Sequence, residues 1–389
     1  MSWLMRTGIA LGMLLLSVFN GYAEDSITVY KLLQRLENIQ LARDSAFPPG
    51  SFPSYRKYST RDDVYKKDDN AFFTALIAFT LKQHQSMYTP AEKLLADRII
   101  NRTKEYYQLF RNTTGRHTYN FWRTNPPVVF PNGDWLNWMN KTHKLPDDID
   151  DTVMILMATD TDEHVAKSVH TLMAQYANTK KRTSKSAYKK YRRMPVYSTW
   201  FGEKMPVDID VCVLSNALNF VHQFHLKYTQ SDSATVKLLG DVMAHKYYLT
   251  NPAFISPHYA RTPIILYHFA RMIQQGKIHE FDQYKPQLIA DAQDCYRKAD
   301  NFLDQVLLSS ALYMLGSKPG TMMLQTDATF DVLLEKNDFV FFVANMSAIM
   351  PAKMRQLMTS AKLGTFYYYC PAYNNVLLLE NLLLARGTM

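Results

Sequence analysis

The chain has 389 residues, of which 47% are apolar and 20% are charged, a balance that excludes an intrinsically disordered protein. Lys and Arg number 44 against 35 Asp and Glu, so the formal net charge is +9 at pH 7. Glycine is scarce, with 13 residues, whereas methionine (20), tyrosine (25) and phenylalanine (21) are abundant, which argues against a turn-rich all-β fold and favours packed helices.

The N-terminus has the pattern of a secretory signal peptide. Arg6 supplies a positive charge, an apolar stretch runs from Thr7 to Val18, and Gly21-Tyr22-Ala23 fits a cleavage site between small residues. The apolar stretch is too short to cross a bilayer, and an uncleaved anchor is the alternative. We therefore expect an exported protein, either periplasmic or secreted. The predicted organisation is a signal peptide at 1–23, a lead-in helix and loop at 24–54, and a single domain at 55–389.

Six segments along the chain repeat one plan. Residues 146–154 and 206–214 share Pro, Asp, Ile and Asp at equivalent positions, and residues 304–312 repeat the pattern of residues 210–218. Each segment places a polar residue before a helix that is apolar on nearly every face, which is typical of a buried helix. The predicted capping residues are Asp69, Asp150, Asp210, Thr262, Asp304 and Asn375.

More amphipathic helices are predicted between these segments, at 92–110, 163–177 and 233–248. Alternation of buried and half-buried helices predicts an all-α fold, an (α/α)6 toroid or barrel with six inner and six outer helices. The inner helices then run parallel, so that their N-termini open at one mouth. The apolar stretch 339–350 is predicted as a further buried helix.

The strongest chemical signal is Asp147-Asp148-Ile149-Asp150-Asp151-Thr152, which places four carboxylates within five positions at the predicted mouth. Capping explains one acid per repeat but not four, because like charges at this spacing repel. One interpretation is a general acid, since crowding and burial raise the pKa of a carboxyl while a helix N-terminus lowers it. Asp150, which is repeated as Asp210, is the best candidate. The alternatives are a site for Ca²⁺ or Mg²⁺ and simple capping with solvation.

The segment Asp148-Ile149-Asp150-Asp151-Thr152 resembles the DxDDT motif of class II terpene cyclases, the squalene and hopene cyclases. These enzymes belong to the terpenoid cyclase and protein prenyltransferase superfamily, whose fold is an α/α toroid. The resemblance implies the same fold over most of residues 55–389. It also implies that Asp150 is the proton donor, with Asp148 and Asp151 as its supports.

Two other functions stay open. Secreted carbohydrate hydrolases and lyases resemble this barrel in overall shape, and Asp150 and Asp210 on neighbouring inner helices form a pair of carboxylates suited to glycoside hydrolysis at the right separation. The other alternative is a non-catalytic toroid that binds a glycan, a lipid or a partner protein, with the acids serving as caps or as Ca²⁺ ligands. Apart from Ca²⁺ or Mg²⁺, no cofactor is expected.

Aromatic and polar residues before the predicted inner helices are candidates for binding a small-molecule, lipid or glycan ligand in the mouth. Aromatic walls suit stacking on a sugar or stabilisation of a carbocation, although ordinary packing explains each residue singly. The substrate-binding candidates are Asp147, Asp208, Tyr119, Trp122, Trp200, His258, Tyr259, Arg261 and Tyr368.

The segment Lys180–Arg193 carries eight positive charges. A solvated outer segment is one interpretation, and attraction to an anionic surface, such as phospholipid head groups or acidic polysaccharide, is the other. Nucleic acid is not an expected partner, since the chain contains no recognised nucleic-acid-binding module.

Overall fold

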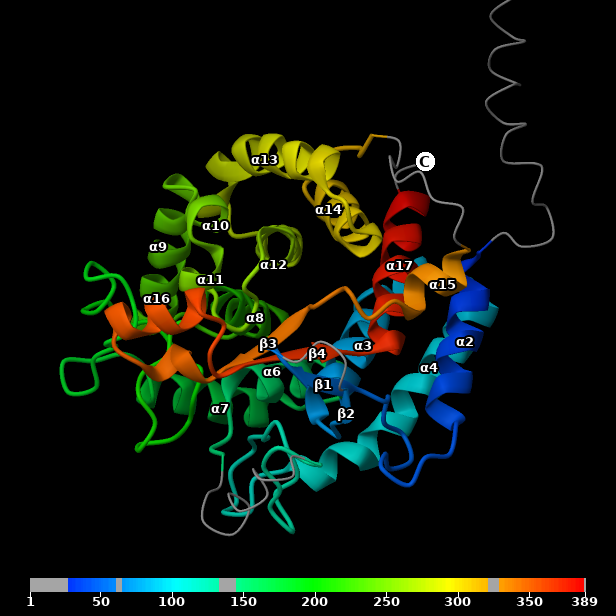
Figure 1. The fold of residues 1–389 in the computed structure, drawn as a ribbon, viewed down its shortest axis with the longest axis horizontal. Coiled ribbons are helices and arrows are strands. Elements are labelled where there is room, and N and C mark those ends of the chain that lie inside the picture. Colours follow the sequence, from blue (N-terminus) through cyan, green and yellow to red (C-terminus); the bar gives the residue numbers. More distant parts are fainter. Residues whose placement is uncertain (1–26, 61–64, 133–144, 321–328, 388–389) are drawn as a thin grey trace, which may run out of the picture.

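The computed structural model describes residues 27–60, 65–132, 145–320 and 329–387, so the predicted signal peptide lies outside the described residues. The described chain is mostly helical and carries a small antiparallel sheet (Figure 1). None of the described helices combines the length and the apolar character that a membrane crossing requires.

Six of the described helices are buried on most faces, as the repeated segments predict. Each packs against the next along the chain, and the last packs back against the first, so their contacts close a circle. Their apolar side chains form about half of one continuous core. A helix with an apolar surface all round stays in the interior because any exposed face would leave apolar area in water. These inner helices are α3 (Ala71–Gln83), α6 (Ile149–Ala158), α8 (Val211–Gln223), α12 (Thr262–Gly276), α14 (Phe302–Met314) and α17 (Pro371–Arg386).

Helices with one apolar face cover the outside of this circle. The outer helices are α2 (Val29–Leu41), α4 (Pro90–Tyr106), α7 (Glu163–Gln175), α9 (Gln230–Ala244) and α13 (Lys285–Lys298). The predicted amphipathic helices correspond to α4, α7 and α9, and the predicted lead-in region contains α2, which packs against α17 and α4. The shorter elements are the helices α10 (Tyr247–Thr250), α11 (Pro252–Ile255), α15 (Phe330–Glu335) and α16 (Ala352–Ser360) and the 3₁₀ helices η2 (Gln85–Met87), η3 (Tyr107–Phe110), η5 (His279–Tyr284) and η6 (Met346–Ile349).

The all-α prediction missed a four-stranded antiparallel sheet with the order β2-β1-β4-β3. Its strands are β1 (Tyr55–Tyr58), β2 (Lys66–Lys67), β3 (Phe342–Asn345) and β4 (Thr365–Tyr369). The predicted buried helix at 339–350 was wrong, since this stretch forms β3 and η6. A short apolar run does not distinguish a buried helix from a strand, and its two adjacent phenylalanines favour a strand.

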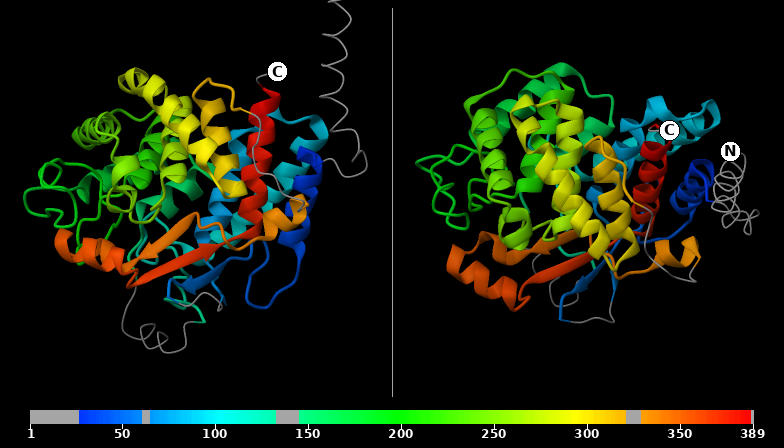
Figure 2. Two further views of the ribbon diagram at one scale, coloured as in Figure 1. Left: turned by 45° about the horizontal axis from the view of Figure 1, so that its top comes forward. Right: turned by 90° about the horizontal axis from the view of Figure 1, so that it is seen from above.

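The sheet lies at one end of the circle of inner helices, and α16 extends from the same side (Figure 2). Strand β4 leads through Cys370 into α17, so the inner helix begins at the sheet. Backbone hydrogen bonds tie this end together, for example from the amide of Val343 on β3 to the carbonyl of His258, at 2.9 Å. The sheet therefore covers the end of the molecule where the acidic segments lie.

Most of the predicted capping residues do not cap. Asp210 caps α8 as predicted, by accepting hydrogen bonds from the amides of Cys212 and Val213. At the other starts the predicted residue lies one position before the cap (Asp69) or inside the helix (Asp150, Thr262, Asp304 and Asn375). The residues at the cap positions are instead Asn70, Asp148, Arg261, Asn301 and Cys370. Capping therefore does not account for Asp150.

The buried inner helices generate a stability prediction. Replacing Leu76 of α3, which is fully buried, with alanine leaves a cavity and is expected to lower the free energy of unfolding by about 2–5 kcal/mol. Leu94 on α4 is 61% exposed, and its alanine variant is expected to stay within about 0.5 kcal/mol of the wild type. Urea unfolding followed by circular dichroism compares the two. Equal losses in both variants would contradict the assignment of α3 to the interior.

Candidate functional site

A cavity of about 360 Å³ lies at the acidic end of the inner helices, against strand β3. Most of its wall is apolar, and six aromatic rings contribute to it: Phe72, Phe121, Trp122, Phe130, Trp200 and Phe342. The ring of Phe121 stacks on that of Phe342, with 5.5 Å between their centres. The polar side chains in the wall are those of Asp148, Asp150, Asp151, Thr199, His258 and Asn345.

The segments that enter the inner helices hold one another through their backbones. The amide of Ile149 donates to the carbonyl of Thr199 at 2.8 Å, and the amide of Phe201 donates to the carbonyl of Asp147 at 3.0 Å. The amide of Asp148 donates to the carbonyl of Tyr119 at 3.3 Å. The acidic segment is thus fixed on both sides before α6 begins, so its side chains have defined positions in the cavity wall.

Asp148 and Asp151 form a pair of buried carboxyl groups. They are 4% and 2% exposed, and a hydrogen bond joins their side chains. Asp148 also caps α6, since its Oδ1 accepts a hydrogen bond from the amide of Asp151 at 2.8 Å. Burial raises the pKa of Asp148 to about 7, although these hydrogen bonds lower it. Burial and the neighbouring charge of Asp148 raise the pKa of Asp151 well above its usual value. The pair therefore holds a proton at neutral pH.

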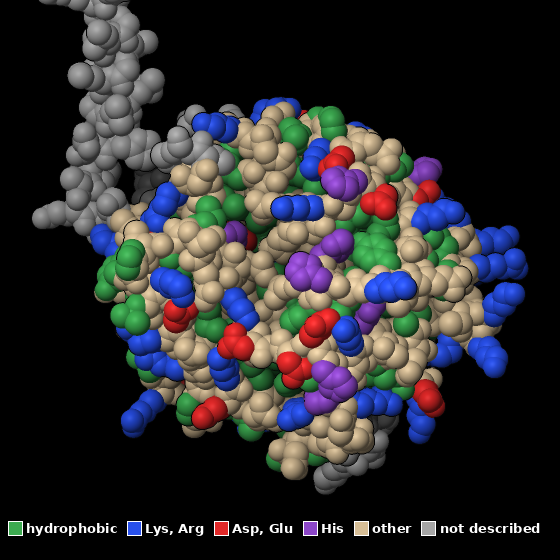
Figure 3. Space-filling view, turned by 180° about the vertical axis from the view of Figure 1, so that it is seen from behind, with side chains coloured by type: hydrophobic (Ala, Val, Ile, Leu, Met, Phe, Trp, Pro, Cys, Tyr) green, Lys and Arg blue, Asp and Glu red, His purple; other side chains and the backbone are tan. Residues whose placement is uncertain are grey.

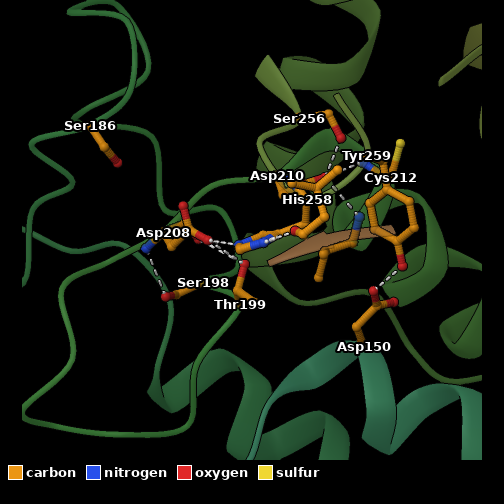
Figure 4. Close-up of polar contacts among 12 residues, drawn as sticks. Asp150, Ser186, Ser198, Thr199, Asp208, Asp210, Cys212, Ser256, His258 and Tyr259 are labelled. Carbon is orange, nitrogen blue, oxygen red and sulfur yellow. Dashed lines mark hydrogen bonds and ion pairs between the residues drawn. The ribbon is translucent and has the colours of Figure 1, made fainter. Parts of the chain in front are cut away.

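Asp150 is stabilised by different contacts. Its Oδ1 accepts a hydrogen bond from Asn216 Nδ2 of α8 at 2.7 Å. Its Oδ2 accepts one from the hydroxyl of Tyr259, which Figure 4 shows. Burial raises the pKa of Asp150 to about 6, whereas both hydrogen bonds lower it. The side chain of Asn216 is oriented in turn by Arg271, whose Nη2 donates to Asn216 Oδ1 at 2.7 Å. Since both oxygens of Asp150 accept hydrogen bonds, these contacts favour its ionised form.

His258 and two further aspartates form the third part of the site (Figure 4). His258 Nε2 lies 2.9 Å from Asp208 Oδ2, and its Nδ1 lies 3.2 Å from the carbonyl oxygen of Val343. Both ring nitrogens thus face acceptors, which suits the imidazolium form. Burial lowers the pKa of His258, but the hydrogen bond and the charge of Asp208 outweigh burial and raise it to about 9. In return, the hydrogen bond and the charge of His258 keep the pKa of Asp208 below its usual value despite burial.

Both carboxylate oxygens of Asp210 accept hydrogen bonds from neighbouring groups. Besides capping α8, its Oδ1 accepts a hydrogen bond from Ser256 Oγ at 2.6 Å and its Oδ2 accepts one from the amide of His258 at 2.9 Å. Burial raises the pKa of Asp210. Asp150 lines the cavity, whereas Asp210 is not among the residues of its wall.

The structure brings together some of the sequence-predicted site residues and separates others. The cavity wall contains Asp148, Asp150, Asp151, Trp122, Trp200 and His258, and Tyr259 contacts Asp150. Outside this wall, Asp147 binds Asn112 and Thr118, and Tyr119 contributes backbone contacts to the acidic segment. Arg261 forms an ion pair with Asp304 at the start of α14. Tyr368 lies on β4, with its hydroxyl 3.5 Å from Asp68.

Sequence reasoning missed Asn216 and Arg271 in particular. Both are polar residues inside helices that are otherwise apolar, and that contrast is the signal that identifies them. Two buried polar atoms of the cavity wall, Asp151 Oδ1 and Trp200 Nε1, lack a hydrogen-bond partner among the described residues. They are therefore available to a ligand.

Within the described ranges, no group of three or more His, Cys, Asp or Glu residues is placed to hold a metal ion. Comparison of the chain with protein-family models, curated proteins and solved structures gives no match.

The carboxyl pair generates a prediction on pH dependence. A carboxyl whose pKa is higher in the folded than in the unfolded protein stabilises the fold fully below about pH 4. This stabilisation is lost as the pH rises through about 7, the value for Asp148. Asp151→Asn removes one member of the pair, so the fall in melting temperature between these pH values is expected to become shallower. Thermal melts across this range, with the exposed Asp300→Asn as control, measure the slope. An unchanged slope in Asp151→Asn would show that the pair does not hold the proton.

The His258–Asp208 contact generates a second prediction. Asp208→Asn removes the charge that contributes most to raising the pKa of His258, so this pKa is expected to fall well below about 9, because burial then outweighs the remaining raising contacts. NMR titration of labelled histidines measures the change, with the His258 signal assigned by His258→Gln. The signal of His279, which is exposed, serves as the internal reference. A His258 pKa that stays near 9 would contradict the role given to Asp208.

Proposed function

We propose that the circle of inner helices is an (α/α)6 toroid and that the protein is an acid–base enzyme which transfers a proton to an apolar substrate in the cavity. The repeated segments and the closed succession of helix contacts support the toroid. One observation carries the function: two buried carboxyl groups, Asp148 and Asp151, lie together in the wall of an aromatic cavity, where burial raises the pKa of both. The signal-peptide pattern supports export of the enzyme.

The proposed proton donor is the pair rather than Asp150. The carboxyl of the pair gives its proton to a substrate atom and becomes a carboxylate. The N-terminal end of α6 and the amide of Asp151 then stabilise the negative charge on Asp148. Asp150, which carries two hydrogen bonds on its oxygens, is ionised more readily than the pair. The sequence-based assignment of Asp150 as the donor remains the alternative, and the variants below distinguish the two.

The wall of the cavity suits positive charge that develops on the protonated substrate. Aromatic faces attract cations, and six rings line this cavity. An ionised Asp150 adds further attraction, because it faces the same cavity. Polar groups are few in this wall, whereas a sugar needs partners for many hydroxyl groups, so the lining favours an apolar substrate over the carbohydrate alternative.

Deuterium transfer tests the proposed function. The purified protein is incubated in D₂O with linear polyenes and polyprenyl alcohols, and mass spectrometry detects a product that carries deuterium on carbon. We expect Asp148→Asn and Asp151→Asn to lower its rate of formation by about 10²–10⁴-fold. The exposed Asp300→Asn is the matched control and should retain the wild-type rate.

Two outcomes would change the assignment. If Asp150→Asn abolishes transfer while the pair variants remain active, Asp150 is the donor, as the sequence motif suggests. If no substrate gains deuterium, or if all the variants match the wild type, the acid–base function is wrong. Infrared spectroscopy of the protein without substrate tests whether the pair is protonated. The absorption band of a protonated carboxyl group is expected at neutral pH in the wild type and should disappear in Asp151→Asn.

A further inference from the structure

Exposed apolar side chains gather in the segment that joins β3 to β4. Ten large apolar side chains are exposed among the described residues, and four of them lie between positions 346 and 363. They are Met346, Met354, Leu357 and Leu363, which we call the α16 patch. Leu357 is the most exposed of the ten, at 71%. The opposite face of the molecule differs, since its apolar side chains are scattered among acidic and basic ones (Figure 3).

Helix α16 is anchored on its inner side, with Met354 and Leu357 directed outward. Arg355, on its inner side, is 1% exposed and donates from Nη2 to the carbonyl of Phe254 at 2.5 Å. The same guanidinium lies over the ring of Phe254, 4.9 Å from its centre, and Nη1 donates to the carbonyl of Ser186 at 3.3 Å. With Arg355 anchored in this way, Met354 and Leu357 on the other side of the helix face solvent.

Cationic side chains surround the α16 patch. A groove of about 480 Å³ separates α16 from the basic segment, and it is lined by Lys189, Arg192 and Lys353. Lys362, next to Leu363, is also exposed. Within the basic segment, Lys190 pairs with Asp241, and the side chains of Arg182 and Arg192 donate to backbone carbonyls. The exposed ammonium groups of Lys189, Lys353 and Lys362 beside α16 are placed to meet an anionic surface.

The α16 patch adjoins the candidate site. Met346 belongs to the patch and also to the cavity wall, together with its neighbour Ala348 on η6. The amide of Met346 donates to the carbonyl of Gly364 at 2.9 Å, which joins η6 to the start of β4. A surface that covers the α16 patch thus lies beside the apolar cavity.

We propose that the protein docks through the α16 patch on an anionic phospholipid bilayer. The four apolar side chains enter the region between head groups and acyl chains, and the surrounding cations contact the phosphate groups. Charge decides between the possible occupants, because a second copy of this basic chain would bring further cations to the patch, whereas anionic lipid neutralises them. The inference does not depend on proton transfer and is tested without turnover.

Vesicle co-sedimentation tests the proposal. We expect the wild-type protein to bind vesicles of phosphatidylcholine with phosphatidylglycerol, and to bind pure phosphatidylcholine vesicles at least about tenfold more weakly. Leu357→Asp should weaken binding to the anionic vesicles by about tenfold or more. Leu94→Asp is the matched control on α4, since Leu94 is also exposed, and should bind like the wild type.

Charge-reversal variants provide a second test in the same vesicle-binding experiment. Lys353→Glu combined with Lys362→Glu is expected to weaken binding by at least about tenfold, whereas Lys237→Glu on the outer helix α9 should change it less than threefold. Circular dichroism confirms that each variant is folded. Equal binding by Leu357→Asp and Leu94→Asp, or no preference for anionic vesicles, would overturn the proposal. A wild-type dimer that Leu357→Asp converts to a monomer, without vesicle binding, would show instead that the patch joins two copies.

Discussion

The structure depends on the burial of carboxylates at the starts of apolar helices. Six aspartates gather at the starts of α6 and α8 alone, none more than 7% exposed: Asp147, Asp148, Asp150, Asp151, Asp208 and Asp210. A buried carboxylate is strongly destabilising unless it is hydrogen-bonded, paired or protonated. Asp150 is hydrogen-bonded, Asp208 is paired with His258, and Asp148 with Asp151 holds a proton. The sheet and the entering segments are needed to supply these partners, so the architecture and the chemistry of the site share one constraint.

The repeated apolar segments were sufficient to predict the inner helices, because a helix without a polar face has to be buried wherever it lies. The sheet was not predicted, because its pairing joins segments that are far apart in the sequence. Strands β1 and β4 pair although more than 300 residues separate them, and each has only four or five residues. Pairing over such a distance leaves no local signal, and the apolar run around Phe342 is compatible with a helix or a strand until its neighbours are known. Most of the predicted cap positions were wrong. The repeat pattern pointed to aspartates, whereas the nearby Asn70 and Asn301 are the residues that cap their helices.

The acidic motif located the candidate site, but the roles within it were not visible in the motif. Trp122, Trp200 and His258 were named from the sequence and do line the cavity, because each lies in a segment that leads toward an inner helix. Arg261 is in an equivalent segment, yet it turns toward Asp304, which offers a nearby opposite charge. Whether a residue of such a segment lines the cavity depends on where the side chains across the mouth lie. A single sequence does not specify those distances.

The comparison of Asp150 with its two neighbours shows how distant residues decide which carboxyl group is the proposed proton donor. All three carboxyl groups lie within four positions of one another and in one cavity wall, so helix position and burial differ little among them. Their partners differ greatly. Asn216 and Tyr259, from the next inner helix and from the segment before α12, donate to Asp150 and stabilise its charge, whereas Asp148 and Asp151 face each other. Arg271, which lies on α12, contributes indirectly because it orients the side-chain amide of Asn216. A motif of adjacent aspartates therefore supplies the carboxyl groups, and the helices packed around them determine which one keeps its proton.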